Sequence, residues 1–161
     1  MRLDEFNALA PDEAAAVVRP CADIPAWIDE IVAARPYGDL GELIDVAQLA
    51  AEGWSDAEVD AALAQHPRIG ERAKGDDAEA TLSRSEQSAM SGLEAEIAAG
   101  NQAYEEKFGR IFLIRAAGRS ADDVLDQLTV RLGHDAETES AVVADQLREI
   151  AVLRLEGMVT A

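Results

Sequence analysis

The feature that most constrains this chain is the spacing of its apolar residues, which recur every three or four positions in almost every segment. That spacing is typical of amphipathic helices, whereas strands would show alternation. Helices are predicted over 11–19, 23–35, 39–54, 55–66, 83–109, 120–133 and 135–159, and the fifth range is one or two helices interrupted near Gly100. The apolar run 110–119 could be extended. The sequence therefore predicts an all-α, compact fold of about seven to eight helices.

Local signals set several boundaries. Ser55-x-x-Glu58 has the capping-box pattern, and Asp23 is placed to cap the helix that follows it. Residues 68–82 show no periodicity, which predicts a loop of about fifteen residues, a length that is often functional. Because no repeat, low-complexity tract or Gly/Ser linker interrupts the chain, we expect one domain over residues 1–161.

Composition limits the partners. The 161 residues are 48% hydrophobic and 29% charged, as in globular proteins, and 14 Lys and Arg against 32 Asp and Glu give a net charge of −18. A field of that sign repels phosphate backbones and anionic membranes, so we expect neither nucleic acid nor a membrane as partner. The single Cys21 excludes an internal disulfide. With no secretory signal or long apolar run, the expected location is the cytoplasm.

Three ionisable residues, His66, Glu86 and Arg154, fall on apolar faces of the predicted helices. Their neighbours there are Val59, Ala62 and Leu63 for His66, Ala89, Met90, Leu93 and Ile97 for Glu86, and Val143, Leu147 and Ile150 for Arg154. Each has a plainer explanation alone: a hydrogen-bonded core histidine, a Ser83–Glu86 capping box, and an arginine that reaches solvent or pairs with a carboxylate. Unpaired buried charge is costly, so together the three should meet in one polar pocket.

Most kinds of catalytic centre lack their residues in this chain. There are only two histidines, His66 and His134, and no HxxxH or HExxH motif, so we expect no metal. Neither a nucleotide-binding glycine motif nor a nucleophile elbow is present. Acid–base chemistry without a cofactor remains, on a small molecule that carries its own electron sink.

Four blocks of sequence carry a resemblance to a known family: HPRIG at 66–70, SRSEQ at 83–87, NQAYEEKFGRIFLIRAAGRS at 101–120 and REIAVLRL at 148–155. Together they resemble the OHCU decarboxylase family, and the likeness extends over essentially the whole chain. The resemblance implies an all-helical, cofactor-independent enzyme that often dimerises, so we expect a homodimer. It also implies the conversion of 2-oxo-4-hydroxy-4-carboxy-5-ureidoimidazoline (OHCU) to (S)-allantoin and carbon dioxide during urate degradation.

The resemblance also implies site residues. It makes His66 the proton donor and adds Glu86 and Arg154 as catalytic side chains. The substrate-binding residues that it implies are Pro67, Ser83, Arg84, Ser85, Glu86, Gln87, Phe112, Leu113, Ile114, Arg115 and Ala116. Relatives often carry Asn at the position of His134, which we expect to lie in a surface turn away from the chemistry. Pro67 denies the loop an amide proton and holds His66 extended, and an imidazole with an ordinary pKa of about 6.5 exchanges protons near neutrality.

The expected reaction breaks a bond between carbon and CO2, and ring C=N and C=O groups of the substrate accept the electron pair. We expect Glu86 and Gln87 to bind ureido and ring N–H groups. Arg154 on the departing carboxylate would stabilise the ground state, so a ring or enolate oxygen is the better partner. Two alternatives stay open: an acidic helical module that binds another protein, and a decarboxylase or hydrolase for another ureido compound.

Overall fold

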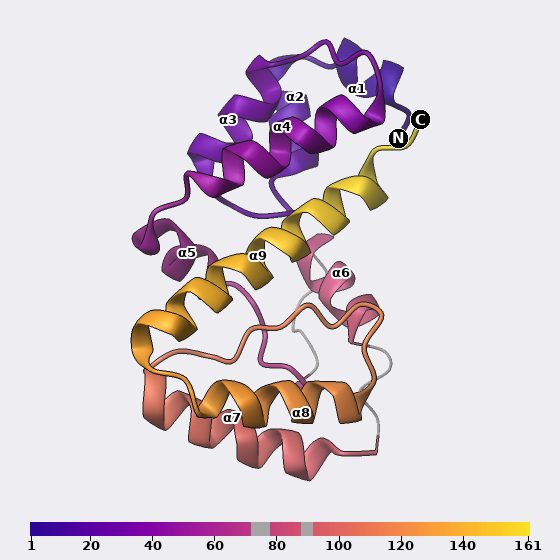
Figure 1. Ribbon diagram of the computed structural model, residues 1–161. Helices are drawn as coiled ribbons and strands as arrows, with labels where there is room; N and C mark the ends of the chain where they lie inside the picture. The colour runs from indigo at the N-terminus through magenta and orange to yellow at the C-terminus, as the bar shows by residue number, and fades with distance from the viewer. Residues whose placement is uncertain (72–77, 88–91) are drawn as a thin grey trace. The chain divides into compact units, whose positions relative to one another are not determined.

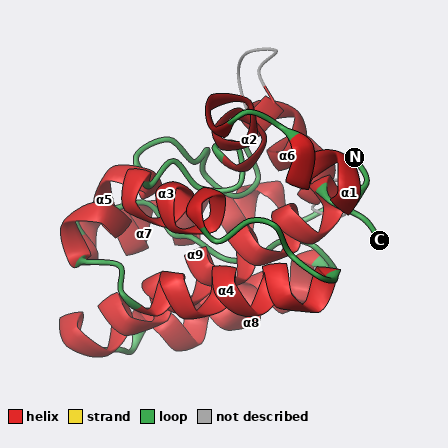
Figure 2. Ribbon diagram, turned by 90° about the horizontal axis from the view of Figure 1, so that it is seen from above, coloured by secondary structure: helices red, strands yellow, loops and turns green. Residues whose placement is uncertain are grey.

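The structure, a computed structural model, describes residues 1–71, 78–87 and 92–161. This part of the chain contains nine helices and no strand (Figures 1 and 2). The helices are α1 Leu3–Ala8, α2 Pro11–Val18, α3 Pro25–Ala33, α4 Leu40–Glu52, α5 Asp56–Leu63, α6 Ala78–Glu86, α7 Glu94–Phe108, α8 Ala121–Leu132 and α9 Ala136–Met158. The all-α prediction is confirmed. The additional helix is α1, whose six residues are too few to show a period.

The chain divides into two compact units. Unit 1 comprises Met1–Ala62 and Arg148–Ala161, and unit 2 comprises Leu63–Leu147. Helix α9 contributes residues to both. His66, Glu86 and the 112–116 segment belong to unit 2, and Arg154 belongs to unit 1.

Unit 1 is built around a tryptophan. Trp27 on α3 is 1% exposed, and its indole Nε1 donates to the Ala47 carbonyl of α4 at 2.8 Å. The Trp54 ring meets it edge to face, with centroids 5.7 Å apart. Unit 1 also buries Phe6, Val18, Ile28, Ile31, Leu43, Ala47, Ala51, Leu155 and Val159. The buried residues of unit 1 are thus mostly aliphatic, with Trp27 and Trp54 among its few large rings.

Both ends of the chain contribute to unit 1. The Leu3 amide donates to the Thr160 carbonyl at 2.8 Å, and the Thr160 amide donates to the Met1 carbonyl at 2.9 Å. Figure 1 shows the two termini side by side. Farther along, Arg148 Nε donates to the Ala51 carbonyl at 2.9 Å. Unit 1 is therefore complete only when 148–161 has joined 1–62.

Unit 2 contains a close approach of α7 and α8 at Gly100. A Cβ atom on Gly100 would lie 2.1 Å from Leu128 Cδ2. The predicted interruption near Gly100 is wrong, because α7 runs unbroken through it and the glycine instead makes room for α8. Helix α6 ends at Glu86 and α7 begins at Glu94; residues 88–91, with Ala89 and Met90 of the predicted apolar face, lie outside the described residues.

The predicted local signals had mixed outcomes. The Ser55–Glu58 capping box is confirmed: Ser55 N donates to Glu58 Oε2 at 2.8 Å, and Glu58 N donates to Ser55 Oγ at 3.3 Å. The predicted Asp23 cap is wrong, because Ile24 is the N-cap and Asp23 Oδ1 accepts from Arg19 Nη1 at 2.7 Å. The predicted 68–82 loop is too long, since α6 begins at Ala78, and 72–77 lie outside the described residues.

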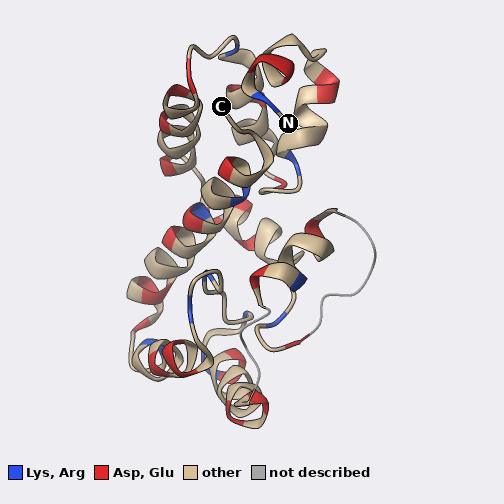
Figure 3. Ribbon diagram, turned by 90° about the vertical axis from the view of Figure 1, so that its right-hand side faces the viewer, with Lys and Arg blue, Asp and Glu red and all other residues tan. Residues whose placement is uncertain are grey.

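In the described part of the chain, Asp and Glu residues are spread along the helices (Figure 3). Several of these carboxylates accept a hydrogen bond within their own helix start, as Glu58 does from Ser55 N at the start of α5. In the portion that the structure describes, no helix combines the length and apolar character needed to cross a membrane.

Candidate functional site

His66 lies in a turn just beyond α5. The helix ends at Leu63, and His66 N donates to the Leu63 carbonyl at 3.0 Å. The predicted position on the last helical turn is therefore wrong, although the side chain is only 5% exposed. Its Nε2 lies 3.7 Å from Glu79 Oε1, in the first turn of α6. This carboxylate attracts the imidazole when the ring is protonated. Sequence reasoning missed Glu79, because it falls in the stretch expected to be loop.

Helix α6 carries the first four residues of the SRSEQ block, and Gln87 follows its end. Ser83 is 2% exposed and lies inside the helix, so the Ser83–Glu86 capping box is wrong: α6 begins five residues before Ser83. Glu86 is the last residue of α6 and is partly buried, as is Arg84, which donates to Thr81 Oγ1 at 3.1 Å. Ser85 is exposed. With capping excluded, Glu86 remains a candidate for binding a ligand.

The loop that follows His66 is attached to both α6 and α7. Gly70 N donates to Gln87 Oε1 at 2.9 Å, and Asn101 Nδ2 donates to the Ile69 carbonyl at 2.8 Å. Gly70 has a φ of 84°, a conformation that favours glycine. The structure therefore brings the HPRIG and SRSEQ blocks together within unit 2. The Gln87 oxygen, expected to bind substrate N–H groups, already accepts one backbone N–H.

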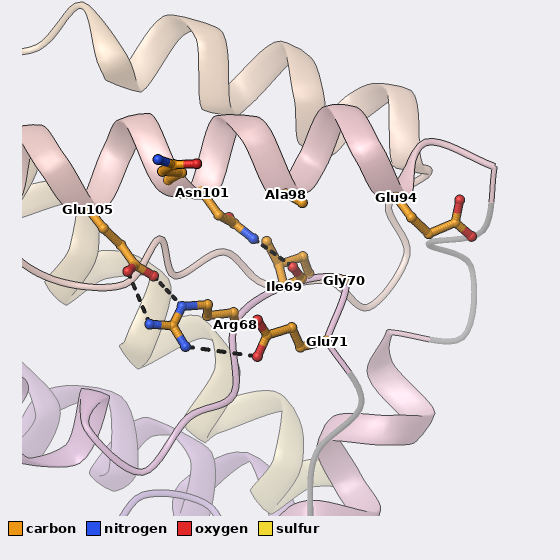
Figure 4. Close-up of a pocket in the computed structure, with 9 residues that line it drawn as sticks. Arg68, Ile69, Gly70, Glu71, Glu94, Ala98, Asn101 and Glu105 are labelled. Atoms are coloured by element: carbon orange, nitrogen blue, oxygen red, sulfur yellow. Dashed lines mark hydrogen bonds and ion pairs between the residues drawn. The ribbon is translucent and has the colours of Figure 1, made fainter.

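A pocket of about 250 Å³ lies between this loop and α7 (Figure 4). Its lining residues are Arg68, Ile69, Gly70, Glu71, Glu94, Ala98, Asn101, Gln102 and Glu105. Arg68 forms an ion pair with Glu105 on α7 and lies 3.9 Å from Glu71. None of the predicted site residues lines this pocket. Asn101 is buried and belongs to the 101–120 block that resembles the family. Its hydrogen bond to Ile69 joins residues 32 positions apart, so local sequence patterns do not predict it.

The predicted substrate-binding segment 112–116 has no regular secondary structure, and the extended conformation considered for 110–119 did not form a strand. Four of its five side chains are buried, namely those of Phe112, Leu113, Ile114 and Ala116. Several side chains hold its backbone, among them Arg119, whose Nε donates to the Arg115 carbonyl at 3.0 Å. Arg131 Nη1 donates to the Leu113 carbonyl at 2.7 Å, and Arg115 N donates to Gln146 Oε1 at 2.9 Å.

A buried cluster of charged and polar side chains lies behind this segment. Arg131 on α8 is 1% exposed and Glu139 on α9 is 0% exposed, and Arg131 Nε donates to Glu139 Oε1 at 2.8 Å. Arg131 Nη2 lies 2.6 Å from the same Glu139 oxygen. Its geometry does not suit a hydrogen bond, so this contact is an ion pair only. The Tyr104 hydroxyl donates to Glu139 Oε1 at 2.6 Å. Burial above all, and then this hydrogen bond, raises the pKa of Tyr104, which therefore stays protonated at neutral pH.

Sequence reasoning missed this cluster, although the apolar-face argument applies to it. Arg131 shares its face of α8 with Val124 and Leu128, and Glu139 shares its face of α9 with Val143 and Leu147. His134 lies in the turn between those helices, as expected, but its Nδ1 is 3.0 Å from the buried Glu139 Oε2. His134 thus contacts the buried carboxylate of Glu139, which its predicted place in a surface turn did not indicate.

Arg154 is the candidate residue of unit 1. It is 3% exposed, and its Nη1 donates to the Pro20 carbonyl at 3.1 Å. The alternative in which it reaches solvent is therefore wrong. The sequence predicts that Arg154 shares one pocket with His66 and Glu86. Because these residues belong to different units, the shared pocket stays a prediction.

The candidate residues offer an imidazole, carboxylates, amides and a guanidinium. Such groups transfer protons and bind the N–H and oxygen groups of a small polar molecule. Throughout the described ranges, no three His, Cys, Asp or Glu side chains come together as metal ligands would. These candidate groups are of the kinds that carry out acid–base chemistry on a polar small molecule.

Comparison with known proteins gives concordant matches. A family model described as OHCU decarboxylase matches residues 7–156. A 2-oxo-4-hydroxy-4-carboxy-5-ureidoimidazoline decarboxylase of Haloferax volcanii is 27% identical over 158 residues, which cover 96% of this chain and 94% of the relative. A uric acid degradation bifunctional protein of Bacillus sp. (strain TB-90) is 25% identical over 97% of this chain but only 32% of its own length.

Two solved structures share the fold. A crystal structure of OHCU decarboxylase in the presence of (S)-allantoin matches with a TM-score of 0.70 and 24% identity, over 85% of this chain and 92% of that one. A crystal structure of (S)-allantoin synthase matches with a TM-score of 0.69 and 17% identity, over 99% of this chain and 54% of that one. At these identities the likeness shows a common fold.

Proposed function

This chain belongs to the OHCU decarboxylase family, and from that premise we propose that it converts OHCU to (S)-allantoin and carbon dioxide in urate degradation. The observation that carries the proposal is the family match over residues 7–156, which includes every candidate residue. The attachment of the HPRIG loop to the end of α6 adds support, because it brings two of the recognised blocks together. A protein-binding module without catalysis would not require these contacts.

The reaction needs little from the protein beyond orientation and one directed proton. The bond to CO2 breaks, its electron pair enters the conjugated ring C=N and C=O groups, and a proton then adds to one face of the ring. Because the substrate itself accepts the electrons, the protein's tasks are to stabilise the developing negative charge and to choose that face.

His66 is the residue to which we assign the proton transfer. Its side chain is almost buried beside Glu79, which limits the directions in which the imidazole can present its proton. Water is largely excluded from a side chain that is 5% exposed, and this favours directed over random protonation. Glu79 then assists by attracting the protonated ring.

The other candidate residues bind the substrate in this proposal. Glu86 and Gln87 accept hydrogen bonds from its ureido and ring N–H groups, and Arg154 binds a ring or enolate oxygen on which negative charge develops. Pro67, Ser83–Ser85 and Phe112–Ala116 complete the contacts. Since the family model spans both units, residues 1–161 act as one domain. The enzyme works without a cofactor or metal, as a cytoplasmic homodimer with neither nucleic acid nor membrane as partner.

The test follows the optical activity of allantoin by circular dichroism after freshly generated OHCU is added. The wild-type protein should give (S)-allantoin faster than the spontaneous reaction, which gives racemic product. His66→Asn should lower the rate by about 10²–10⁴-fold, the usual contribution of a general acid or base, and the product should lose its handedness.

A matched control separates chemistry from folding. Asn7→Ala removes the paired hydrogen bonds of 2.9 Å between Asn7 and Tyr37 in unit 1, at a cost of about 1–2 kcal/mol, without touching a candidate residue. It should lower the melting temperature and keep the wild-type rate. If His66→Asn makes (S)-allantoin at the wild-type rate, His66 has no part in the mechanism. If the wild-type protein does not accelerate OHCU decay, the proposed function is wrong.

A further inference from the structure

The backbone of residues 112–116 is held mainly by side chains that come from elsewhere in unit 2. Lacking the hydrogen bonds of a helix or strand, the segment depends on other groups to fix its carbonyls and amides. One of these is the guanidinium of Arg131, which reaches from the last turn of α8 to the Leu113 carbonyl at 2.7 Å.

Arg131 contacts the segment in a second way. Its guanidinium carbon lies 4.5 Å from the centroid of the Phe112 ring, within the range of a cation–π contact. The Phe112 ring in turn meets Tyr104 edge to face at 5.2 Å. One side chain therefore fixes both a ring and a neighbouring carbonyl of the segment. Lysine lacks the planar fork needed to do both.

Glu139 fixes the orientation of Arg131. It accepts from Arg131 Nε at 2.8 Å, so Nη1 is left aimed at Leu113. Glu139 is itself held by the Tyr104 hydroxyl at 2.6 Å and by His134 Nδ1 at 3.0 Å. The Nη1 donor of this buried ion pair is satisfied by a carbonyl of the irregular segment, so the orientation of the pair and the backbone of the segment depend on each other.

We propose that Arg131, oriented by Glu139, is a positioning residue for the decarboxylation, because it fixes the backbone of Phe112–Ala116 in the conformation that binds substrate. The inference rests on the proposed function, since the family resemblance is what assigns substrate contacts to this segment. Arg131 itself does not touch the substrate in this account.

The test uses three variants of the full-length chain. Arg131→Lys keeps the charge and loses the fork. Glu139→Gln keeps the shape of the partner and loses its charge. Leu128→Ala is the control for lost packing alone: it truncates a side chain that is 1% exposed, one turn earlier on α8, in the same hydrophobic cluster as Phe112, Ile114 and Ala116, and it removes no group that hydrogen-bonds to the segment. All are assayed well below their melting temperatures.

Two readouts are measured. In hydrogen–deuterium exchange, the peptide that contains 112–116 should exchange faster in Arg131→Lys and Glu139→Gln than in Leu128→Ala. In kinetics with OHCU, Arg131→Lys should raise KM by about tenfold with a much smaller change in kcat, because ground-state binding is what the segment supplies. Glu139→Gln should act in the same direction and less strongly, and Leu128→Ala should keep the wild-type KM.

The outcomes separate the inference from its premise. Unchanged exchange at 112–116 in folded Arg131→Lys would show that Arg131 does not hold the segment. Faster exchange with wild-type KM would overturn the positioning role. If Arg131→Lys does not fold, Glu139→Gln decides by the same two readouts. A wild-type protein that leaves OHCU untouched would overturn the proposed function and the substrate role, while exchange would still decide whether Arg131 is the anchor.

Discussion

Substitution of Gly100 by alanine tests the packing of α7 on α8. The new Cβ would lie 2.1 Å from Leu128 Cδ2 and 3.0 Å from Leu128 Cγ, far inside the ordinary carbon–carbon separation of about 3.5–4.0 Å. Leu128 is 1% exposed, so its side chain has little room to turn away. Overpacking of this kind costs about 1–3 kcal/mol. We take about 3 kcal/mol for so short a contact, and the better helix propensity of alanine returns about 1 kcal/mol. The expected net loss is about 2 kcal/mol.

The double variant makes the cause identifiable. Leu128→Ala alone should cost about 3 kcal/mol, within the usual range for a buried leucine. In Gly100→Ala/Leu128→Ala the clash disappears, while the added methyl group fills part of the cavity and the propensity gain remains. We therefore expect a loss of about 2 kcal/mol instead of the summed 5 kcal/mol, a coupling of about 3 kcal/mol.

The assay is urea unfolding followed by far-ultraviolet circular dichroism for the wild type, both single variants and the double variant. Equal slopes against urea would show that the compared states expose similar surface. Losses that add to within about 0.5 kcal/mol would refute the reasoning, because residues in contact should couple. A single Gly100→Ala variant more stable than the wild type would refute it as well.

Three further predictions concern the site and the pH range. Glu79→Gln should lower kcat/KM by about tenfold, less than the loss of His66 itself, because it weakens the attraction for the protonated imidazole; an unchanged pH–rate profile would exclude that role. Burial raises the pKa of Tyr37 to about 12, so the unfolded chain ionises first, near pH 10. Stability should then be full below about pH 10 and fall as the pH rises toward 12. Thermal melts of Tyr37→Phe should show a shallower fall, to which Tyr104, whose pKa is also raised by burial, still contributes. EDTA should leave OHCU turnover unchanged, because the substrate accepts the electron pair itself; activity lost to EDTA and restored by zinc or magnesium would contradict this.

The helices could be predicted because their signals are local. The capping box at Ser55 involves residues three apart, and apolar periodicity needs only a window of sequence. The predictions from local patterns failed where the local structure depends on a residue distant in the sequence or on a competing interaction. Asp23 had the right place for a cap, but Arg19 holds its carboxylate. Gly100 has a low helix propensity, but the side chain of Leu128 determines what can stand there.

The site was predictable in part for the same reason. His66 and Arg154 were recognised as ionisable residues on apolar faces, and both side chains are almost fully buried. Glu79 escaped because its contact with His66 depends on a helix that begins in a stretch without periodicity. Arg131 and Glu139 also lie on apolar faces of their helices, as Arg154 does, but they fall outside the four blocks that resemble the family.

The division of the chain also bears on how the protein is made on the ribosome. Unit 2 is contiguous, so it can fold as soon as it has emerged, whereas unit 1 waits for a C-terminal piece that is synthesised 85 residues after its first part ends (147 − 63 + 1). At about 5–20 residues per second, that delay is about 4–17 s. Throughout it, nascent residues 1–62 lack Leu155 and Val159, two fully buried side chains of their unit. The N-terminal helices are therefore the part of the nascent chain with the longest need of chaperones, and slow translation of 63–147 should lengthen their exposure.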